Sequence, residues 1–173
     1  FISKASDTEN IAKSLSSNRG IYLVPAFTGL GAPYWDVSAR GLLSGLTRDT
    51  GPKEIIRATI ESVAYQTNDL FEAMKNDGLK PKLIKVDGGM VLNNWFSQFL
   101  SDMINAKVLR PKVNETTALG AAFMAGLQIG VYKSLKDIAK NWQADKSFTP
   151  KIKNAERKIL INGWDKAIKK TLA

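Results

Sequence analysis

Short hydrophobic runs alternate with longer amphipathic segments along this chain, and this alternation restricts its possible folds more than any other feature. The runs at 21–24, 82–87 and 107–110 are rich in β-branched residues, and each is closed by proline or glycine. Segments with apolar residues three or four positions apart follow at 52–76, 94–104 and 118–130. Strands and helices that alternate at this spacing indicate an α/β layered fold with parallel pairing among the later strands.

Three further helices are expected at 7–15, 135–142 and 155–172. The helix at 52–76 carries an apolar stripe that we expect to be buried, made of Ile56, Ile60, Val63, Leu70 and Met74. The loop at 27–36 is rich in glycine, proline and aromatic residues, which favours a packed loop over a mobile one. Core packing is likewise expected for the aromatic residues Tyr22, Phe27, Tyr34, Trp35, Trp95 and Trp142.

The composition excludes several kinds of chemistry, because the chain contains neither cysteine nor histidine. Disulfides, thiol nucleophiles, histidine bases and metal sites with Cys or His ligands are therefore excluded. Carboxylates, lysine, arginine, hydroxyls, backbone amides and Mg²⁺ remain, and phosphoryl transfer uses this inventory. The lack of cysteine fits a cytoplasmic protein. No apolar run reaches the roughly 20 residues that cross a bilayer, so we expect no membrane insertion.

The positive charge is concentrated near the C-terminus. The net charge is +9, and residues 131–173 carry 11 Lys and Arg against 4 Asp and Glu. Such a tail could bind nucleic acid or an acidic membrane. However, its lysines are interleaved with apolar residues at helical spacing, which favours a solvated helix face. We therefore expect no nucleic-acid partner, and a steep salt dependence of binding would identify the alternative.

A glycine pair after the run at 82–87 is the first candidate site. Gly88 and Gly89 would let backbone N–H groups approach a phosphate or nucleotide, and the next helix would add its positive N-terminal end. The same pair also fits a tight turn without a ligand. The carboxylates nearest to glycine-rich loops, Asp36 and Asp87, are expected to be turn residues rather than bases. The small residues of 118–130 fit either a close helix crossing or a hinge.

Several motifs, in this order, resemble those of the FGGY carbohydrate kinases, and the resemblance runs over essentially the whole chain. The first motif contains Phe-Thr-Gly-Leu-Gly-Ala-Pro-Tyr-Trp and points to the glycerol-specific branch over the pentulose kinases. The second resembles the second family signature, in which seven residues separate its two halves. The residues that carry the resemblance are 24–36, 41–46 with 54–61, 86–91 with 93–94, and 115–122.

The resemblance implies that residues 1–173 form one actin-like, RNase H-type lobe, the C-terminal one of two, with ATP in the cleft between the lobes. By this analogy Gly88 and Gly89 approach the adenosine and phosphates, Asn93 lines the adenine side, and the helix at 118–130 belongs to the hinge. The implied reaction transfers the γ-phosphoryl group of ATP to glycerol, giving sn-glycerol 3-phosphate, with Mg²⁺ bridging the phosphates.

No part of the chain resembles the family's N-terminal phosphate loop, its glycerol-contacting residues or its aspartate base. We therefore assign no catalytic residue and no metal ligand within this sequence, and we expect the chain alone to be inactive. The implied partners are the N-terminal lobe and, at full length, further copies of the enzyme. Two alternatives remain: another FGGY kinase acting on a pentulose or other polyol, and a nucleotide-binding module without catalysis.

Overall fold

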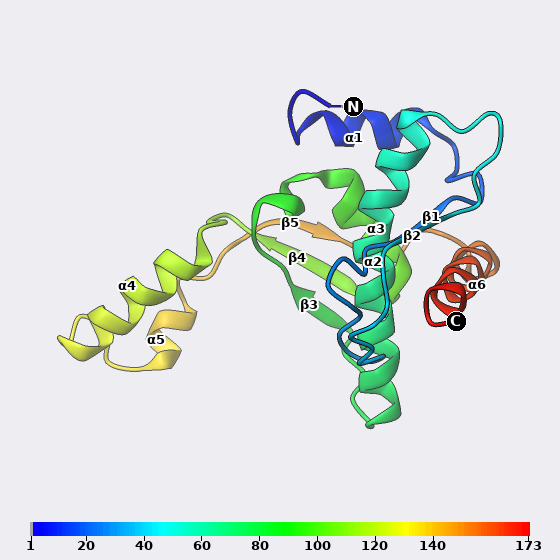
Figure 1. Ribbon diagram of the computed structural model, residues 1–173. Helices are drawn as coiled ribbons and strands as arrows, with labels where there is room; N and C mark the ends of the chain where they lie inside the picture. Colours follow the sequence, from blue (N-terminus) through cyan, green and yellow to red (C-terminus); the bar gives the residue numbers. More distant parts are fainter. Residues whose placement is uncertain (1) are drawn as a thin grey trace.

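A long helix, α2 (Pro52–Asn76), runs through most of the molecule, and the other elements are arranged around it (Figure 1). The computed structural model describes residues 2–173. The remaining elements, in chain order, are α1 (Asp7–Ser14), β1 (Tyr22–Val24), β2 (Leu42–Ser44), β3 (Leu83–Lys85), η1 (Gly89–Leu92), α3 (Asn94–Ile104), β4 (Lys107–Pro111), α4 (Thr116–Gln128), α5 (Leu135–Ala139), β5 (Ala144–Phe148) and α6 (Asn154–Thr171).

The main sheet has the strand order β3-β4-β5. Strands β3 and β4 are parallel, with Leu83 opposite Lys107, which confirms the parallel pairing predicted for the later strands. Strand β5 is antiparallel to β4 and places Phe148 opposite Val108. The short strands β1 and β2 form a separate antiparallel pair. The mixed α/β class is therefore as predicted.

Two strands, β2 and β5, were not anticipated, and the helix expected before β5 is shorter than predicted. The helix α5 ends at Ala139, whereas the sequence predicted a helix to residue 142. Strand β5 follows with the sequence Ala-Asp-Lys-Ser-Phe, in which Phe148 is buried and the other four residues are exposed. A polar edge strand of this kind has almost no apolar alternation, so its sequence gives little signal.

The stripe predicted to be buried on α2 is wrong in part. Ile60 is buried, but Val63, Leu70 and Met74 are 36%, 38% and 40% exposed. The buried side of α2 instead carries charged and polar residues, including Arg57 and Glu61. These residues can be buried because they bond to one another, which offsets the loss of hydration.

The centre of this polar face is Glu61, which is fully buried. Its carboxylate accepts hydrogen bonds from Arg57 Nε at 2.7 Å, Asn18 Nδ2 at 3.0 Å and the Tyr65 hydroxyl at 3.0 Å. Burial raises the pKa of Glu61, and the bonds from Arg57, Tyr65 and Asn18 oppose that rise. Arg57 also donates to the carbonyl of Leu15, so the network ties the end of α1 to α2.

The aromatic loop also departs from expectation. Phe27 and Trp35 are each 77% exposed, whereas Tyr34 packs partly against the core. Asp36 is a turn residue, as predicted: its carboxylate accepts from the hydroxyl and backbone N–H of Ser38 and from the backbone N–H of Ala39. These hydrogen bonds, the Ser38 hydroxyl first, lower the pKa of Asp36.

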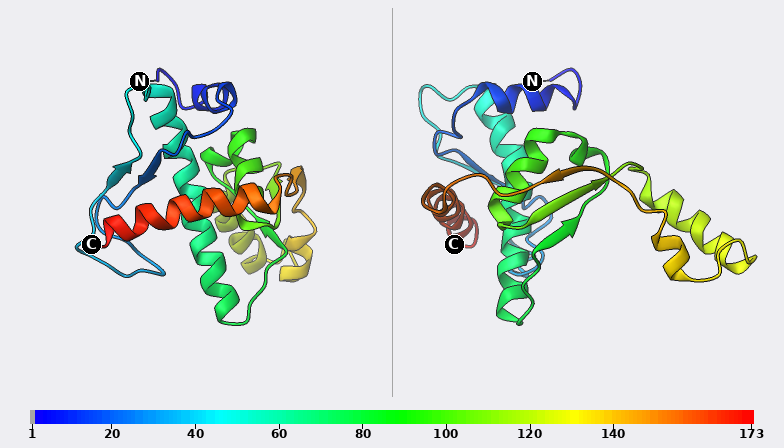
Figure 2. Two further views of the ribbon diagram at one scale, coloured as in Figure 1. Left: turned by 90° about the vertical axis from the view of Figure 1, so that its right-hand side faces the viewer. Right: turned by 180° about the vertical axis from the view of Figure 1, so that it is seen from behind.

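Helices α4 and α5 form an arm that projects away from the sheet (Figure 2). Most small residues of α4 are exposed or half-buried, so the close helix crossing proposed for them is not formed within the described part of the chain. Gly126 is the exception, since the ring of Tyr132 lies where its side chain would be. The hinge role of α4 remains a prediction. Among the described helices, none is long and apolar enough to cross a membrane.

Candidate nucleotide site

The glycine pair lies just beyond the end of β3, where the chain turns toward α3. Gly88 has a φ of 85°, in the left-handed region that favours glycine, and Gly89 begins the short 3₁₀ helix η1. A Cβ placed at either glycine would meet no other heavy atom within 4 Å. Both glycines therefore present backbone to open space, which fits close approach by a ligand.

A cavity of about 620 Å³ opens beside this turn, between α1 and η1. Gly89 and Asn93 both line it, so the structure brings two of the three predicted nucleotide-site residues together, while Gly88 lies one residue outside the lining. Ile60 of α2 also contributes. The remaining lining residues are Ile2, Ala5, Ser6, Thr8, Glu9, Met90 and Leu92.

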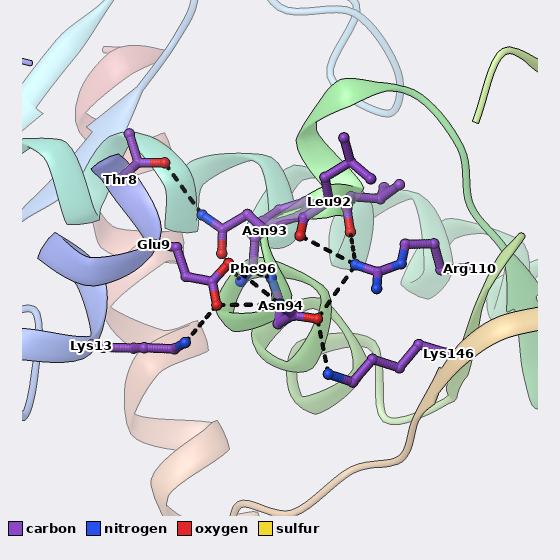
Figure 3. A network of polar contacts seen from close by, with 10 residues as sticks. Thr8, Glu9, Lys13, Leu92, Asn93, Asn94, Phe96, Arg110 and Lys146 are labelled. Atoms are coloured by element: carbon purple, nitrogen blue, oxygen red, sulfur yellow. Dashed lines mark hydrogen bonds and ion pairs between the residues drawn. The ribbon is translucent and has the colours of Figure 1, made fainter. Parts of the chain in front are cut away.

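Asn93 serves the fold and the cavity together, as the close-up shows (Figure 3). It is the N-cap of α3, and its Oδ1 accepts from the backbone N–H of Phe96 at 2.9 Å. Its Nδ2 donates to the Thr8 hydroxyl at 3.3 Å. An amide nitrogen has two hydrogens, so a second donor remains for a ligand in the cavity. The cap predicted for this helix is thus confirmed.

Glu9 of α1 fixes the neighbouring residue, Asn94 (Figure 3). Its Oε2 accepts from the backbone N–H of Asn94 at 3.0 Å, and its Oε1 accepts from the Asn94 side-chain amide at 3.3 Å. Partial burial acts to raise the pKa of Glu9, but hydrogen bonds from Lys13 and Asn94 outweigh it, and the pKa is lowered. Glu9 is therefore a carboxylate at neutral pH.

Asp87 has a different role from the cavity residues. Its carboxylate accepts a hydrogen bond from the Thr116 hydroxyl at the first residue of α4. The contact joins the glycine turn to the base of the α4–α5 arm. The contact reaches across 29 residues rather than within a turn, so the expected turn role stays a prediction, and Asp87 does not line the cavity.

The α1 side of the cavity was missed by sequence reasoning. Thr8 and Glu9 lie about 80 residues before the glycine turn, and only the packing of α1 against α2 and α3 brings them there. A helix of eight residues with ordinary polar side chains has no local signal for a binding role. Ile60 was noted only as a core residue.

The cavity combines apolar walls with a few hydrogen-bonding groups. Ile60, Met90 and Leu92 offer surfaces for a flat heterocycle, and Asn93 and Thr8 supply polar contacts. Within residues 2–173, no group of three or more Asp, Glu, His or Cys side chains is arranged to hold a metal ion. Apolar walls, amide and hydroxyl groups and an open glycine turn are the features that suit a nucleotide.

Comparison with known proteins identifies close relatives. Glycerol kinase 1 of Pseudomonas aeruginosa is 52% identical over 98% of this chain, and the glycerol kinase of Gluconobacter oxydans is 50% identical over 99%. The chain spans about a third of the length of these curated relatives, 34% in each case.

Solved structures agree in fold. The crystal structure of Plasmodium falciparum glycerol kinase with ADP matches 99% of this chain and 35% of its own chain, with 35% identity and a TM-score of 0.87. A ligand-bound xylulose kinase from Lactobacillus acidophilus matches 92% of this chain and 32% of its own, with 27% identity and a TM-score of 0.74. Residues 3–129 match the family described as "FGGY family of carbohydrate kinases, C-terminal domain". With its actin-like α/β fold, the chain thus belongs to the FGGY family of carbohydrate kinases.

Proposed function

We propose that this chain is the ATP-binding lobe of a glycerol kinase, which transfers the γ-phosphoryl group of ATP to glycerol and yields sn-glycerol 3-phosphate. The observation that carries the proposal is the cavity that brings Gly89 and Asn93 together opposite α1. The identity of about half to curated glycerol kinases supports the choice of glycerol, and the ADP that accompanies the Plasmodium falciparum enzyme in its crystal structure supports the choice of nucleotide.

In this proposal Gly88, Gly89 and Asn93 hold the nucleotide. The two glycines allow the phosphates or ribose to approach the backbone, because no side chain stands in the way. The free amide hydrogen of Asn93 donates to the base, while Ile60 and Leu92 contact its faces. This lobe thus binds and orients ATP and excludes water from one side of it.

The remaining parts of the reaction come from outside this chain. We assign the acceptor site and the general base to an upstream lobe, because the matched part is only 34% of the length of the Pseudomonas aeruginosa relative. Mg²⁺ enters with the ATP phosphates, whose charge it neutralises in phosphoryl transfer. The exposed apolar residues of the α4–α5 arm, such as Met124 and Ile129, fit a surface that faces that lobe. We also propose a cytoplasmic location and a homo-oligomeric full-length enzyme.

Calorimetric titration of the chain with ATP and Mg²⁺ tests the site. Gly89→Trp fills the cavity wall with an indole and should abolish binding. Gly31→Trp is the matched control, because a Cβ at Gly31 also meets open space and Gly31 lies outside the cavity lining. Equal binding by the Gly89 variant and the unsubstituted chain would show that the nucleotide binds elsewhere.

A second assay tests the acceptor, because xylulose kinases share the fold at a TM-score of 0.74. The full-length polypeptide is incubated with ATP, Mg²⁺ and either glycerol or xylulose, and product formation is followed. We expect phosphorylation of glycerol by the full-length protein and none by residues 1–173 alone. Phosphorylation of xylulose without phosphorylation of glycerol would reject the proposal in favour of a pentulose kinase.

A further inference from the structure

We infer that Arg110 and Glu9 are positioning residues that clamp η1 and Asn93 from opposite sides, so that the wall of the candidate nucleotide cavity keeps one shape. Arg110 is on β4 and Glu9 is on α1, and both reach the segment between the glycine turn and α3 (Figure 3). The importance of the clamp for ATP rests on the function proposed above. The clamp itself rests on contacts that need no ligand.

Arg110 holds the end of η1 by its carbonyl groups. Its Nη1 donates to the carbonyls of Val91 at 3.0 Å and Leu92 at 3.2 Å, while only 8% of the residue is exposed. These carbonyls lie at the C-terminal end of a helix, where a positive charge is favourable. Asp145 of β5 holds the other edge of the guanidinium, accepting from Nε at 2.9 Å and from Nη2 at 2.6 Å. The guanidinium group of Arg110 is therefore held by the η1 carbonyls on one edge and by Asp145 on the other.

Glu9 holds the other side of the segment. Glu9 accepts a hydrogen bond from the backbone N–H of Asn94. The side-chain Oδ1 of Asn94 in turn accepts from Arg110 Nη1 at 3.4 Å and from Lys146 Nζ at 2.9 Å. Asn94 thus stands between an acidic residue of α1 and two basic residues of the sheet. The adjacent bond from Asn93 to Thr8 follows the same direction toward α1.

The wall needs this support because η1 is short. It has four residues, and 3₁₀ helices of this length have poor hydrogen-bond geometry of their own. Gly88 before it and Gly89 at its start add backbone freedom. Hydrogen bonds to charged groups are stronger than neutral ones, so loss of Arg110 should increase local opening of η1 by about 10- to 100-fold.

Amide hydrogen exchange of the ligand-free chain tests the clamp. Arg110→Met keeps much of the side-chain length but removes every donor, and Asp145, 46% exposed, can then be hydrated. The informative amides are those of Asn93, Asn94 and Phe96, which are bonded to Met90, Glu9 and Asn93. We expect their exchange to accelerate about tenfold or more, with little change in the centre of α2.

Arg157→Met is the matched control. Arg157 is partly buried, with 16% of its side chain exposed, and also donates to a backbone carbonyl, that of Met103 at 2.6 Å, but it lies on α6. Its loss should leave the three amides unchanged. If Arg110→Met fails to fold, Glu9→Ala provides the same test, because alanine suits α1 and the Asn94 amide loses its acceptor. Unchanged exchange at Asn94 in the folded variants would overturn the clamp.

The ATP titration then separates positioning from simple structural support. Apparent affinity falls in proportion to the fraction of molecules whose wall is ordered, so we expect a weaker Kd for Arg110→Met than for Arg157→Met, about fivefold if one molecule in five keeps the ordered wall. Faster exchange with an unchanged Kd would overturn the positioning role. Failure of the unsubstituted chain to bind ATP would count against the proposed function, while the exchange data would still decide the clamp.

Discussion

Replacement of Asp69 by asparagine should stabilise the protein at neutral pH and have little effect at pH 4. Asp69 lies on the buried side of α2 and is 9% exposed. The indole N–H of Trp164 on α6 donates to its Oδ2 at 2.8 Å. The pKa of Asp69 is raised to about 6 by burial, with a smaller contribution from the nearby carboxylates of Asp165 and Glu72, against the hydrogen bonds from Trp164 and Tyr34.

The sign and size of the effect follow from this pKa. An unfolded aspartate titrates near pH 4, so between pH 4 and 6 the folded state binds the proton that the unfolded state has released. Stability therefore decreases as pH rises through this window and levels off above it. A difference of two units corresponds to at most about 3 kcal/mol, and water at the rim of the site reduces this figure.

Asparagine removes the titration while keeping the shape of the side chain. Its Oδ1 can still accept from Trp164, and its amide replaces the buried negative charge by a neutral group. Because Glu61 and Asp102 also have raised pKa values, the pH dependence of one protein alone mixes several groups. The difference between Asp69→Asn and the original chain isolates the contribution of Asp69.

Urea unfolding followed by circular dichroism at several pH values between 4 and 8 measures this difference. The variant should match the original chain near pH 4 and exceed it by about 2–3 kcal/mol at pH 7–8. A difference that stays constant over this range, or that favours the original chain more strongly at higher pH, would refute the assigned titration.

Three further predictions concern separate parts of the structure. Gly45→Ala should destabilise by more than about 2 kcal/mol, because its Cβ would collide with a backbone carbonyl at a φ of 89°, whereas Gly78→Ala, at a φ of 87° in open space, should lose only about 1 kcal/mol in the same urea assay. Arg57→Met should destabilise by about 3–5 kcal/mol by leaving Glu61 buried without its cation, and a loss below about 1 kcal/mol would contradict this. Asn93→Asp should keep the helix cap and normal stability but weaken ATP binding in calorimetry, since a carboxylate accepts from the backbone but cannot donate to the base; unchanged affinity would contradict this.

Local signals explain why the segment from β3 to α3 could be predicted. A hydrophobic run, two glycines and a capping asparagine before an apolar helix each act within a few residues. The structure has all three in order, with Asn93 bonded to the third amide beyond it. The parallel β3–β4 pair followed from the helix between the strands, since such a connection requires a crossover.

Tertiary packing explains most of what the sequence did not predict. The polar buried face of α2 depends on Asn18, outside the helix, and on bonds among residues four apart, such as Arg57 with Glu61. From the sequence alone, a charged residue at such a position predicts a solvent-exposed side chain. The apolar stripe of α2 instead stays partly exposed at Val63, Leu70 and Met74.

The candidate site shows how a proposed nucleotide-binding residue can also have an ordinary structural role. Asn93 would be selected at its position for the cap alone, because its oxygen satisfies an otherwise free amide of α3. Serine, threonine or aspartate would serve that role equally well, but only asparagine also presents an N–H donor toward the cavity. Several residue types can therefore supply the helix cap at this position, but only asparagine supplies both the cap and the N–H donor. The capping role can be predicted from the sequence of α3 alone. The cavity role can be recognised only when the position of α1 is known, because α1 forms the opposite wall and accepts a hydrogen bond from Asn93 through Thr8.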